Sequence, residues 1–291
     1  ERLDALREQG TKNGVNDLQL IGREEVRSLE PEAECGAALL SPSTGIIDSH
    51  AYLLALQADL EVAGGTVVLN SRVSGVVVRN GGFEFDVDED RFRCRTLVNA
   101  AGLWAPELAS GIFRGHGPLL QGPNVGAAHG RDQPCSGPPI DRNAHLAKGH
   151  YFTYSGSSPF DHLVYPLPSN GVLGIHSTND LSGAARFGPD ITWVDEIDYS
   201  FDASRKPDFV RAIRQYFPGL DDSRLSPGYT GIRSKLHGPG EAVPDFLIES
   251  EREHGVPGLV NLLGMESPAL TASLAIGTLV AELLQASVPN R

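Results

Sequence analysis

Two apolar runs, each followed by very small residues, constrain the fold of this chain more than any other feature. Residues 96–99 lead into Ala100-Ala101-Gly102, and residues 259–263 lead into Gly264. Uninterrupted apolar strands are typical of α/β sheets that helices cover on both faces. Small residues at the end of such a strand allow a ligand to approach the backbone closely. The sequence therefore predicts a mixed α/β fold with a ligand near each strand end.

Hydrophobic periodicity predicts the other elements. Segments with a helical period, or with helix start and stop signals, are expected to form helices at 1–10, 23–29, 50–63, 208–216 and 268–285. Segments with a strand pattern are expected at 37–40, 66–69, 73–78, 83–87, 91–98, 151–154, 163–165, 172–176 and 229–236. The four strands from 66 to 98 predict an antiparallel meander. Residues 110–147, with seven Gly and five Pro, predict an irregular insertion or lid.

Composition excludes several classes of protein. A chain of 291 residues with 40% apolar and 21% charged residues can bury a core. Its formal net charge of −13 disfavours binding to nucleic acid or to an anionic membrane surface. Cys35, Cys94 and Cys135 lie far apart, which favours free thiols in a reducing compartment over disulfides or a zinc site.

No segment suggests a membrane protein or a metalloprotein. The longest apolar stretch, residues 270–283, is shorter than the ~20 residues that a bilayer requires. No secretory signal pattern begins the sequence, so we expect a soluble, cytoplasmic protein without a membrane span. Histidines lie near an acid or another histidine at a few places, such as Asp48 and His50, but at spacings that are not typical of metal ligands. No metal site is therefore expected.

The segment from 259 to 271 predicts a strand, a tight turn and a helix. Ser267 is the expected N-cap and Pro268 the first helical residue. The unpaired N–H groups and the dipole at such a terminus favour a negative oxygen of a ligand. A well-capped helix without a ligand has the same pattern. The dinucleotide fingerprint Gly-x-Gly-x-x-Gly, the P-loop, His-Glu-x-x-His and Gly-x-Ser-x-Gly do not occur.

In their order along the chain, the motifs resemble those of FAD-dependent oxidoreductases of the glycine/D-amino-acid oxidase superfamily, most of all the L-2-hydroxyglutarate dehydrogenase/oxidase group. The motifs that carry the resemblance are Leu29-Glu30-Pro31, Ser41-Pro42-Ser43-Thr44-Gly45, Val98-Asn99-Ala100-Ala101-Gly102, Lys148-Gly149-His150-Tyr151-Phe152, Leu173-Gly174-Ile175-His176, Gly231-Ile232-Arg233-Ser234-Lys235 and Gly264-Met265-Glu266-Ser267-Pro268-Ala269-Leu270-Thr271. That family begins with a β-α-β unit carrying the glycine fingerprint, and this chain is expected to start after it.

The resemblance implies FAD as cofactor, and it implies which residues hold it. Val73 would lie near the adenine, Asn99, Ala100, Ala101 and Gly102 near the ribose and pyrophosphate, and residues 264–271 at the isoalloxazine ring. Those last residues are Gly264, Met265, Glu266, Ser267, Pro268, Ala269, Leu270 and Thr271. A negative charge beside a reduced flavin is unfavourable, so the carboxylate of Glu266 is expected to point away from the ring.

The oxidation of a 2-hydroxy acid also requires a base and a cation for the carboxylate. We expect His176 to act as the base or hydroxyl partner and Arg233 to hold the carboxylate of the small carboxylic-acid substrate. His50, Lys148, Tyr165 and Lys235 are further candidates for substrate binding. A histidine or arginine with a purely structural hydrogen bond remains the alternative at each position. Nothing in the sequence identifies the electron acceptor.

The predicted organisation interleaves two domains. Residues 1–45 form a helix tail and part of a substrate domain, 46–109 part of an FAD-binding domain, 110–147 the insertion, 148–236 the substrate domain, and 237–291 the rest of the FAD-binding domain. Two alternatives stay open. The chain could oxidise an amino acid or an N-methyl amine, or it could be a truncated, non-catalytic remnant that does not hold FAD.

Overall fold

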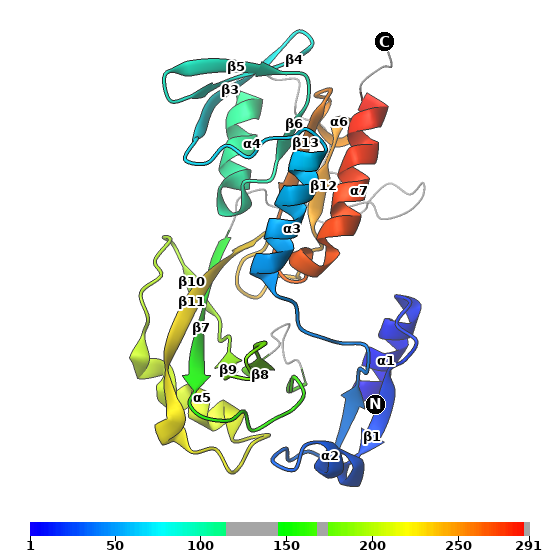
Figure 1. The fold of residues 1–291 in the computed structure, drawn as a ribbon, viewed down its shortest axis with the longest axis vertical. Helices are drawn as coiled ribbons and strands as arrows, with labels where there is room; N and C mark the ends of the chain where they lie inside the picture. The colour runs from blue at the N-terminus through cyan, green and yellow to red at the C-terminus, as the bar shows by residue number, and fades with distance from the viewer. Residues whose placement is uncertain (115–144, 168–173, 288–291) are drawn as a thin grey trace. The chain divides into compact units, whose positions relative to one another are not determined.

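The computed structural model of the protein describes residues 1–114, 145–167 and 174–287 (Figure 1). Its contacts divide the chain into two compact units. Unit 1 comprises residues 1–67, 148–192 and 198–232, and unit 2 comprises residues 68–147, 193–197 and 233–291. Both contain helices and strands, which confirms the mixed α/β class. Residues 46–67, predicted with the FAD-binding domain, group with unit 1; the assignment of domains to cofactor and substrate stays a prediction.

Unit 1 is built on a five-stranded sheet. The strand order is β10-β7-β9-β8, and β11 pairs with β7. The strands are β7 (His145–Tyr154), β8 (His176–Asn179), β9 (Ala185–Gly188), β10 (Thr192–Val194) and β11 (Leu225–Lys235). The pairs β7–β9 and β8–β9 are antiparallel. Figure 1 shows β7 and β11 as two long neighbouring strands, and both continue into residues of unit 2.

Aromatic side chains on one face of this sheet form the core of unit 1. Phe152 of β7 and Phe187 of β9 lie directly opposite each other and are fully buried. Helix α5 (Lys206–Ile213) adds Phe209 and Ile213, which are four residues apart and so lie on one face of the helix. The amino-terminal elements of the chain contribute Ile21 and Val26 to the same cluster. These elements are α1 (Arg2–Lys12), β1 (Gln19–Gly22), α2 (Arg23–Leu29) and β2 (Ala37–Leu40).

Unit 2 contains two three-stranded sheets. The first is the predicted antiparallel meander β3 (Val73–Arg79), β4 (Gly82–Val87) and β5 (Asp90–Cys94). The second has the order β12-β13-β6, where β12 (Leu247–Glu249) is antiparallel to β13 (Leu259–Leu263), and β6 (Leu97–Asn99) is parallel to it. A short 3₁₀ turn, η1 (Gly102–Trp104), follows β6, and α6 (Glu251–His254) connects β12 to β13. Both apolar runs therefore form strands, as predicted, and the structure adds that the two strands are parallel neighbours.

Helix α4 (Ala105–Arg114) shows that part of the predicted insertion is regular. Ala105, Ala109 and Ile112 recur at helical spacing and are buried, so the helix has an apolar face that packs on the second sheet. Strand β7 likewise begins at His145. The expectation of irregular structure was therefore wrong for residues 110–114 and 145–147. The remainder, residues 115–144 with Cys135, lies outside the described residues, and Cys35 and Cys94 are free thiols.

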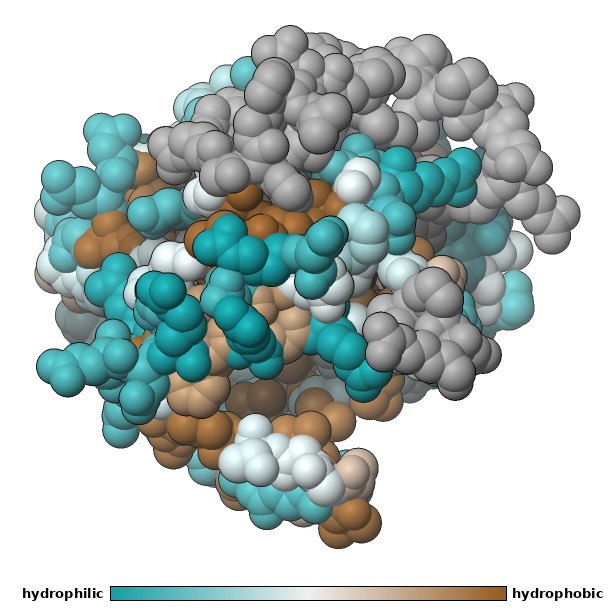
Figure 2. Space-filling model, turned by 90° about the horizontal axis from the view of Figure 1, so that it is seen from above, coloured by the Kyte–Doolittle hydropathy of each residue, from teal (hydrophilic) through white to brown (hydrophobic). Residues whose placement is uncertain are grey.

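Helices α3 (Ser49–Val62) and α7 (Ala269–Ser287) are the two longest helices among the described residues, and neither has a buried residue, as is also true of α1. In α7, Leu270 and Leu274 are 45% and 64% exposed. Figure 2 shows one face of the whole molecule, where apolar side chains, in brown, lie among polar ones, in teal. Within the described part of the chain, α7 is the one helix long and apolar enough to cross a membrane, with a mean hydropathy of 1.5. It extends through Glu282 to Ser287, beyond the predicted stretch, but length and composition alone are weak evidence for a span.

Other boundaries differ from the predictions for local reasons. Residues 66–69 form no strand, and the single segment expected over 91–98 is divided between β5 and β6, which belong to different sheets. Strand β8 begins at His176, whereas a strand ending there was expected. Around Val164 only an isolated bridge to Ser177 forms. Each of these depends on which distant strand supplies a partner, and local periodicity does not reveal that.

Candidate functional site

The end of β13 and the start of α7 lie beside a cavity in unit 2. Gly264 follows the strand with φ +67°, a left-handed conformation that favours glycine. The cavity has a volume of about 260 Å³. Its lining residues are Leu236, His237, Val243, Pro244, Asp245, Phe246, Gly264, Glu266, Ser267 and Pro268. Four of the eight residues predicted at the isoalloxazine ring therefore surround one cavity. Three of the others, Ala269, Leu270 and Thr271, form the first turn of α7, and Met265 lies in the turn before it.

The helix start differs from the prediction by one residue. Helix α7 begins at Ala269, and the backbone N–H of Ala272 donates to the carbonyl of Pro268 at 3.1 Å. Pro268 is therefore the residue before the helix, and Ser267 is not its N-cap. The Thr271 hydroxyl also donates to the Pro268 carbonyl, at 2.9 Å. The first N–H groups of a helix have no partner within it, so the terminus still offers donors to a ligand.

Glu266 pairs with the two cations that the sequence nominated on β11. The ammonium Nζ of Lys235 donates to both carboxylate oxygens of Glu266, at 2.7 and 3.0 Å. The guanidinium of Arg233 lies 3.9 Å from the same carboxylate. Lys235 is only 11% exposed at its side chain, so this pairing is partly shielded from water. The negative charge of Glu266 is thus offset by neighbouring positive charge.

Asn99 joins the ends of β6 and β13 inside unit 2. Its side-chain amide donates to the Ala105 carbonyl at 2.8 Å and to the Asn261 amide oxygen at 3.1 Å. Its own amide oxygen accepts from the N–H of Ala101 at 3.3 Å. Asn99 and Asn261 are 1% and 0% exposed, and they lie opposite each other in the parallel pair. Asn99 therefore fixes the path of Ala100, Ala101 and Gly102, as a ligand-binding strand end requires.

Val73, predicted near the adenine, begins β3 and is 40% exposed opposite Val87. His50 lies in the first turn of α3, where its backbone N–H donates to the Asp48 carboxylate at 3.0 Å, and it is exposed. No contact among the described residues joins either of them to the other candidates. Their predicted roles stay predictions. Across the described ranges, no group of three or more His, Cys, Asp or Glu side chains could hold a metal ion.

His176 and Tyr165, predicted separately, meet in unit 1. Their rings stack with centroids 4.2 Å apart and an interplanar angle of 15°. The Nδ1 atom of His176 lies 3.1 Å from the Gly174 carbonyl. Because a carbonyl only accepts, Nδ1 carries the proton in the neutral ring and Nε2 is the basic nitrogen. Burial raises the pKa of Tyr165, with a smaller contribution from Tyr151, so its phenol stays protonated at neutral pH.

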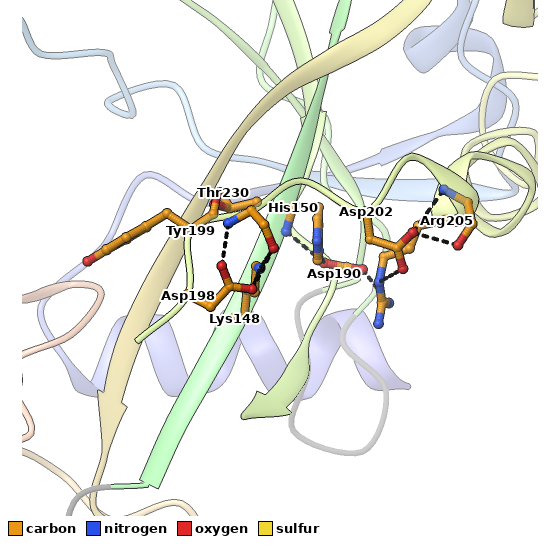
Figure 3. Close-up of polar contacts among 10 residues, drawn as sticks. Lys148, His150, Asp190, Asp198, Tyr199, Asp202, Arg205 and Thr230 are labelled. Carbon is orange, nitrogen blue, oxygen red and sulfur yellow. Dashed lines mark hydrogen bonds and ion pairs between the residues drawn. The ribbon is translucent and has the colours of Figure 1, made fainter. Parts of the chain in front are cut away.

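Lys148 lies on the opposite face of the sheet from this pair. Lys148, His150 and Phe152 alternate along β7, and Phe152 points into the core. Lys148 Nζ donates to Asp198 at 3.0 Å and to the Ser200 hydroxyl at 3.3 Å (Figure 3). The ammonium of Lys148 thus forms an ion pair with Asp198 and does not contact His176. Strand alternation separates the two candidates.

His150, Asp190 and Arg205 form a second cluster of polar side chains next to Lys148 (Figure 3). The Asp190 carboxylate accepts from the backbone N–H of His150 at 2.7 Å and contacts His150 Nδ1 at 3.0 Å. The guanidinium of Arg205 donates to the other oxygen of Asp190 at 2.6 Å. The sequence analysis missed Asp190, Asp198 and Arg205. The acidic composition of 190–202 was a signal for the two aspartates only, and it does not indicate which strand they contact.

We predict that Asn99→Ala destabilises unit 2 by about 1–3 kcal/mol, because the buried Ala105 carbonyl loses its donor. Urea unfolding followed by circular dichroism measures the change. The control is Asn16→Ala, since Asn16 is exposed and bonds only to the nearby Gly14 carbonyl. It should change stability by less than about 0.5 kcal/mol. Equal stability of Asn99→Ala and the unmodified chain would contradict the role assigned to Asn99.

The contribution of the ion pair between Asp198 and Lys148 to stability should depend on pH. Hydrogen bonds from the Ser200 hydroxyl and backbone N–H, and then from Lys148, lower the pKa of Asp198 from its usual 3.8. A lowered carboxyl pKa contributes stability that is present above pH ~4 and is lost as pH falls through the folded-state value. The urea midpoint of Asp198→Asn should therefore lie below that of the unmodified chain from pH 5 to 8. The gap should narrow below pH ~4, and a gap that widens there would refute this assignment.

Comparison with known proteins identifies the class. A family model described as FAD dependent oxidoreductase (DAO) matches residues 1–283. The chain therefore belongs to this family of FAD-dependent oxidoreductases.

Among characterised relatives, the chain is similar to the mitochondrial L-2-hydroxyglutarate dehydrogenase of Arabidopsis thaliana, with 37% identity. That alignment covers 96% of this chain and 62% of the plant protein, so the chain spans less than two thirds of its length. The human mitochondrial L-2-hydroxyglutarate dehydrogenase is 25% identical, with 98% of this chain and 67% of that protein aligned.

Solved structures show the same fold. The FAD-bound L-α-glycerophosphate oxidase of Mycoplasma pneumoniae has a TM-score of 0.71 at 21% identity, covering 99% of this chain and 71% of that one. The glycine oxidase of Bacillus cereus has a TM-score of 0.70 at 14% identity, covering 100% and 72%. At these identities the likeness concerns the fold alone.

Proposed function

We propose that this chain is an FAD-dependent oxidoreductase that oxidises a 2-hydroxy acid of the 2-hydroxyglutarate type. The observation that carries the proposal is the stacked pair of His176 and Tyr165 in a chain 37% identical to an L-2-hydroxyglutarate dehydrogenase. The relatives' activity supports the substrate class, and the pair supplies a base beside a protonated phenol. The finer fold assignment, a flavin-binding part interleaved with a substrate domain, belongs to this proposal.

The residues of unit 2 fit a flavin. At Gly102, with φ +59°, an added Cβ would meet open space, so the backbone is accessible there. At Gly264, with φ +67°, an added Cβ would lie 2.6 Å from the side chain of Leu236, which also lines the cavity. The cavity beside Gly264 and the first turn of the 19-residue helix α7 complete the site. Residues 99–102 would hold the ribose and pyrophosphate, and residues 264–271 the ring. When bound, FAD supplies a hydride acceptor at N5.

The charges around this cavity suit a cofactor that gains negative charge on reduction. Lys235 and Arg233 offset the carboxylate of Glu266. The helix terminus adds partial positive charge in the same unit. Arg233, predicted to hold the substrate carboxylate, lies 3.9 Å from Glu266 and retains guanidinium donors beyond that contact. We keep Arg233 and Lys235 as candidates for carboxylate binding.

In unit 1, His176 would accept the proton of the substrate hydroxyl. Its ring is held by the stack on Tyr165 and by the Gly174 carbonyl, which fixes the basic nitrogen. Tyr165 would donate a hydrogen bond from its phenol, because its pKa is raised.

The test is anaerobic reduction of the FAD-loaded chain, followed by loss of flavin absorbance in a stopped-flow instrument. We expect bleaching by 2-hydroxyglutarate and none by glycine or sarcosine. Bleaching by the amines and not by the hydroxy acid would replace the proposal with an amine oxidase. A chain that takes up no FAD would favour a non-catalytic remnant.

We predict that His176→Gln lowers the rate of flavin reduction by 2-hydroxyglutarate about 10²–10⁴-fold, as loss of a general base does. The flavin spectrum before reduction should not change, because the residues proposed to hold the ring are 264–271. His162→Gln is the control, since His162 is half exposed and contacts Glu30. An unchanged rate in His176→Gln would remove His176 from the proposed chemistry.

A further inference from the structure

The five-stranded sheet of unit 1 has a second face, opposite its aromatic core. Side chains alternate between the two faces of a strand. Phe152 and Phe187 point into the core, so their neighbours Tyr151 and Arg186 lie on the second face. His176 lies opposite Gly188, two residues along β9 from Arg186. Arg186 and His176 therefore share one face, about 7 Å apart along the strand direction.

Aromatic rings connect these residues across the face. Tyr151 of β7 stacks on Tyr229 of β11, with centroids 4.6 Å apart and an interplanar angle of 14°. The guanidinium carbon of Arg186 lies 5.9 Å from the centre of the Tyr229 ring. A Cβ on Gly188 would lie 2.8 Å from the ring of Tyr151, so a glycine is needed for this ring to rest over β9. The face thus carries a base, phenols and a cation within one unit.

Arg186 is held in place and is still accessible. Its NH2 group donates to Asp180 at 2.8 Å, and its side chain is 37% exposed. Asp180 also accepts from the backbone N–H groups of Ser182 and Ala184, at 2.9 and 3.1 Å. Asp180 and the Tyr229 ring therefore fix the guanidinium from two sides. A guanidinium has five N–H donors, and the bond to Asp180 uses one of them.

We propose that Arg186 binds the second carboxylate of a dicarboxylic 2-hydroxy acid whose hydroxyl lies at His176. This inference rests on the proposed function and deepens it, because it assigns the residue that distinguishes a dicarboxylate from a monocarboxylate. A guanidinium suits this role because its planar fork matches the two oxygens of a carboxylate. Arg186 lies on the same sheet face as His176, whereas the guanidinium of Arg233 is close to Glu266 in unit 2.

Binding of non-oxidisable acids tests the inference separately from catalysis. The probes are glutarate and butyrate, added to the chain in the presence of FAD and followed by isothermal titration calorimetry. The variants are Arg186→Met and Arg186→Lys. The matched control is Arg211→Met, since Arg211 is an exposed arginine of α5 that also pairs with an aspartate, Asp208.

We expect Arg186→Met to weaken glutarate binding about tenfold to a hundredfold, as loss of a charge-assisted hydrogen-bond pair does. Arg186→Lys should lose less glutarate affinity than Arg186→Met, because lysine keeps the positive charge but not the planar pair of N–H donors. Butyrate binding should be the same in all variants, and Arg211→Met should bind both acids as the unmodified chain does. A circular dichroism melting curve shows whether each variant folds.

Two results would overturn the inference. One is glutarate binding that is equal in Arg186→Met and the unmodified chain. The other is an unmodified chain that binds glutarate no more tightly than butyrate. Failure of the proposed function gives a different result: glutarate binding would depend on Arg186, yet 2-hydroxyglutarate would not bleach the flavin.

Discussion

The contact between Asn99 and Asn261 is the interaction on which the proposed cofactor site depends. These residues are 162 positions apart, and their buried amides meet at 3.1 Å across two parallel strands. A buried polar group is costly unless it is hydrogen-bonded, so this pairing favours one register of β6 against β13. That register makes neighbours of the two strands that lead into Ala100-Ala101-Gly102 and into Gly264. The Asn99 side chain then fixes the path of the chain towards Gly102 through its bonds to Ala101 and Ala105.

In unit 1, the alternation of side chains along single strands separates two sets of polar groups. On the core side of β7, Lys148 contacts Asp198 and His150 contacts Asp190. These contacts attach the segment that contains the two aspartates to the strand. On the opposite side, Tyr151 faces the same direction as His176 and Arg186. A shift of one residue in register would exchange the two sets. The buried pair of Phe152 and Phe187 prevents such a shift.

Much of the architecture could be predicted because it follows from local pattern. The strand at Leu259–Leu263 and the meander from Val73 to Cys94 have strong signals in their apolar residues and turns. Helix α4 was missed because two of its three buried positions are alanines, which resemble the small residues of a loop. The pairing of His176 with Tyr165, the engagement of Lys148, and the position of Arg186 depend on strand register, which a single sequence does not specify.

The central claim is that unit 2 holds FAD at the ends of β6 and β13, and titration of FAD into the purified chain tests it most directly. The visible absorption spectrum is recorded at each addition, for the unmodified chain and for Asn99→Ala. We predict saturable shifts of the flavin bands near 370 and 450 nm (roughly the values of the cofactor itself), with weaker binding in Asn99→Ala. A spectrum that stays that of free flavin, even with FAD in excess, would contradict the claim.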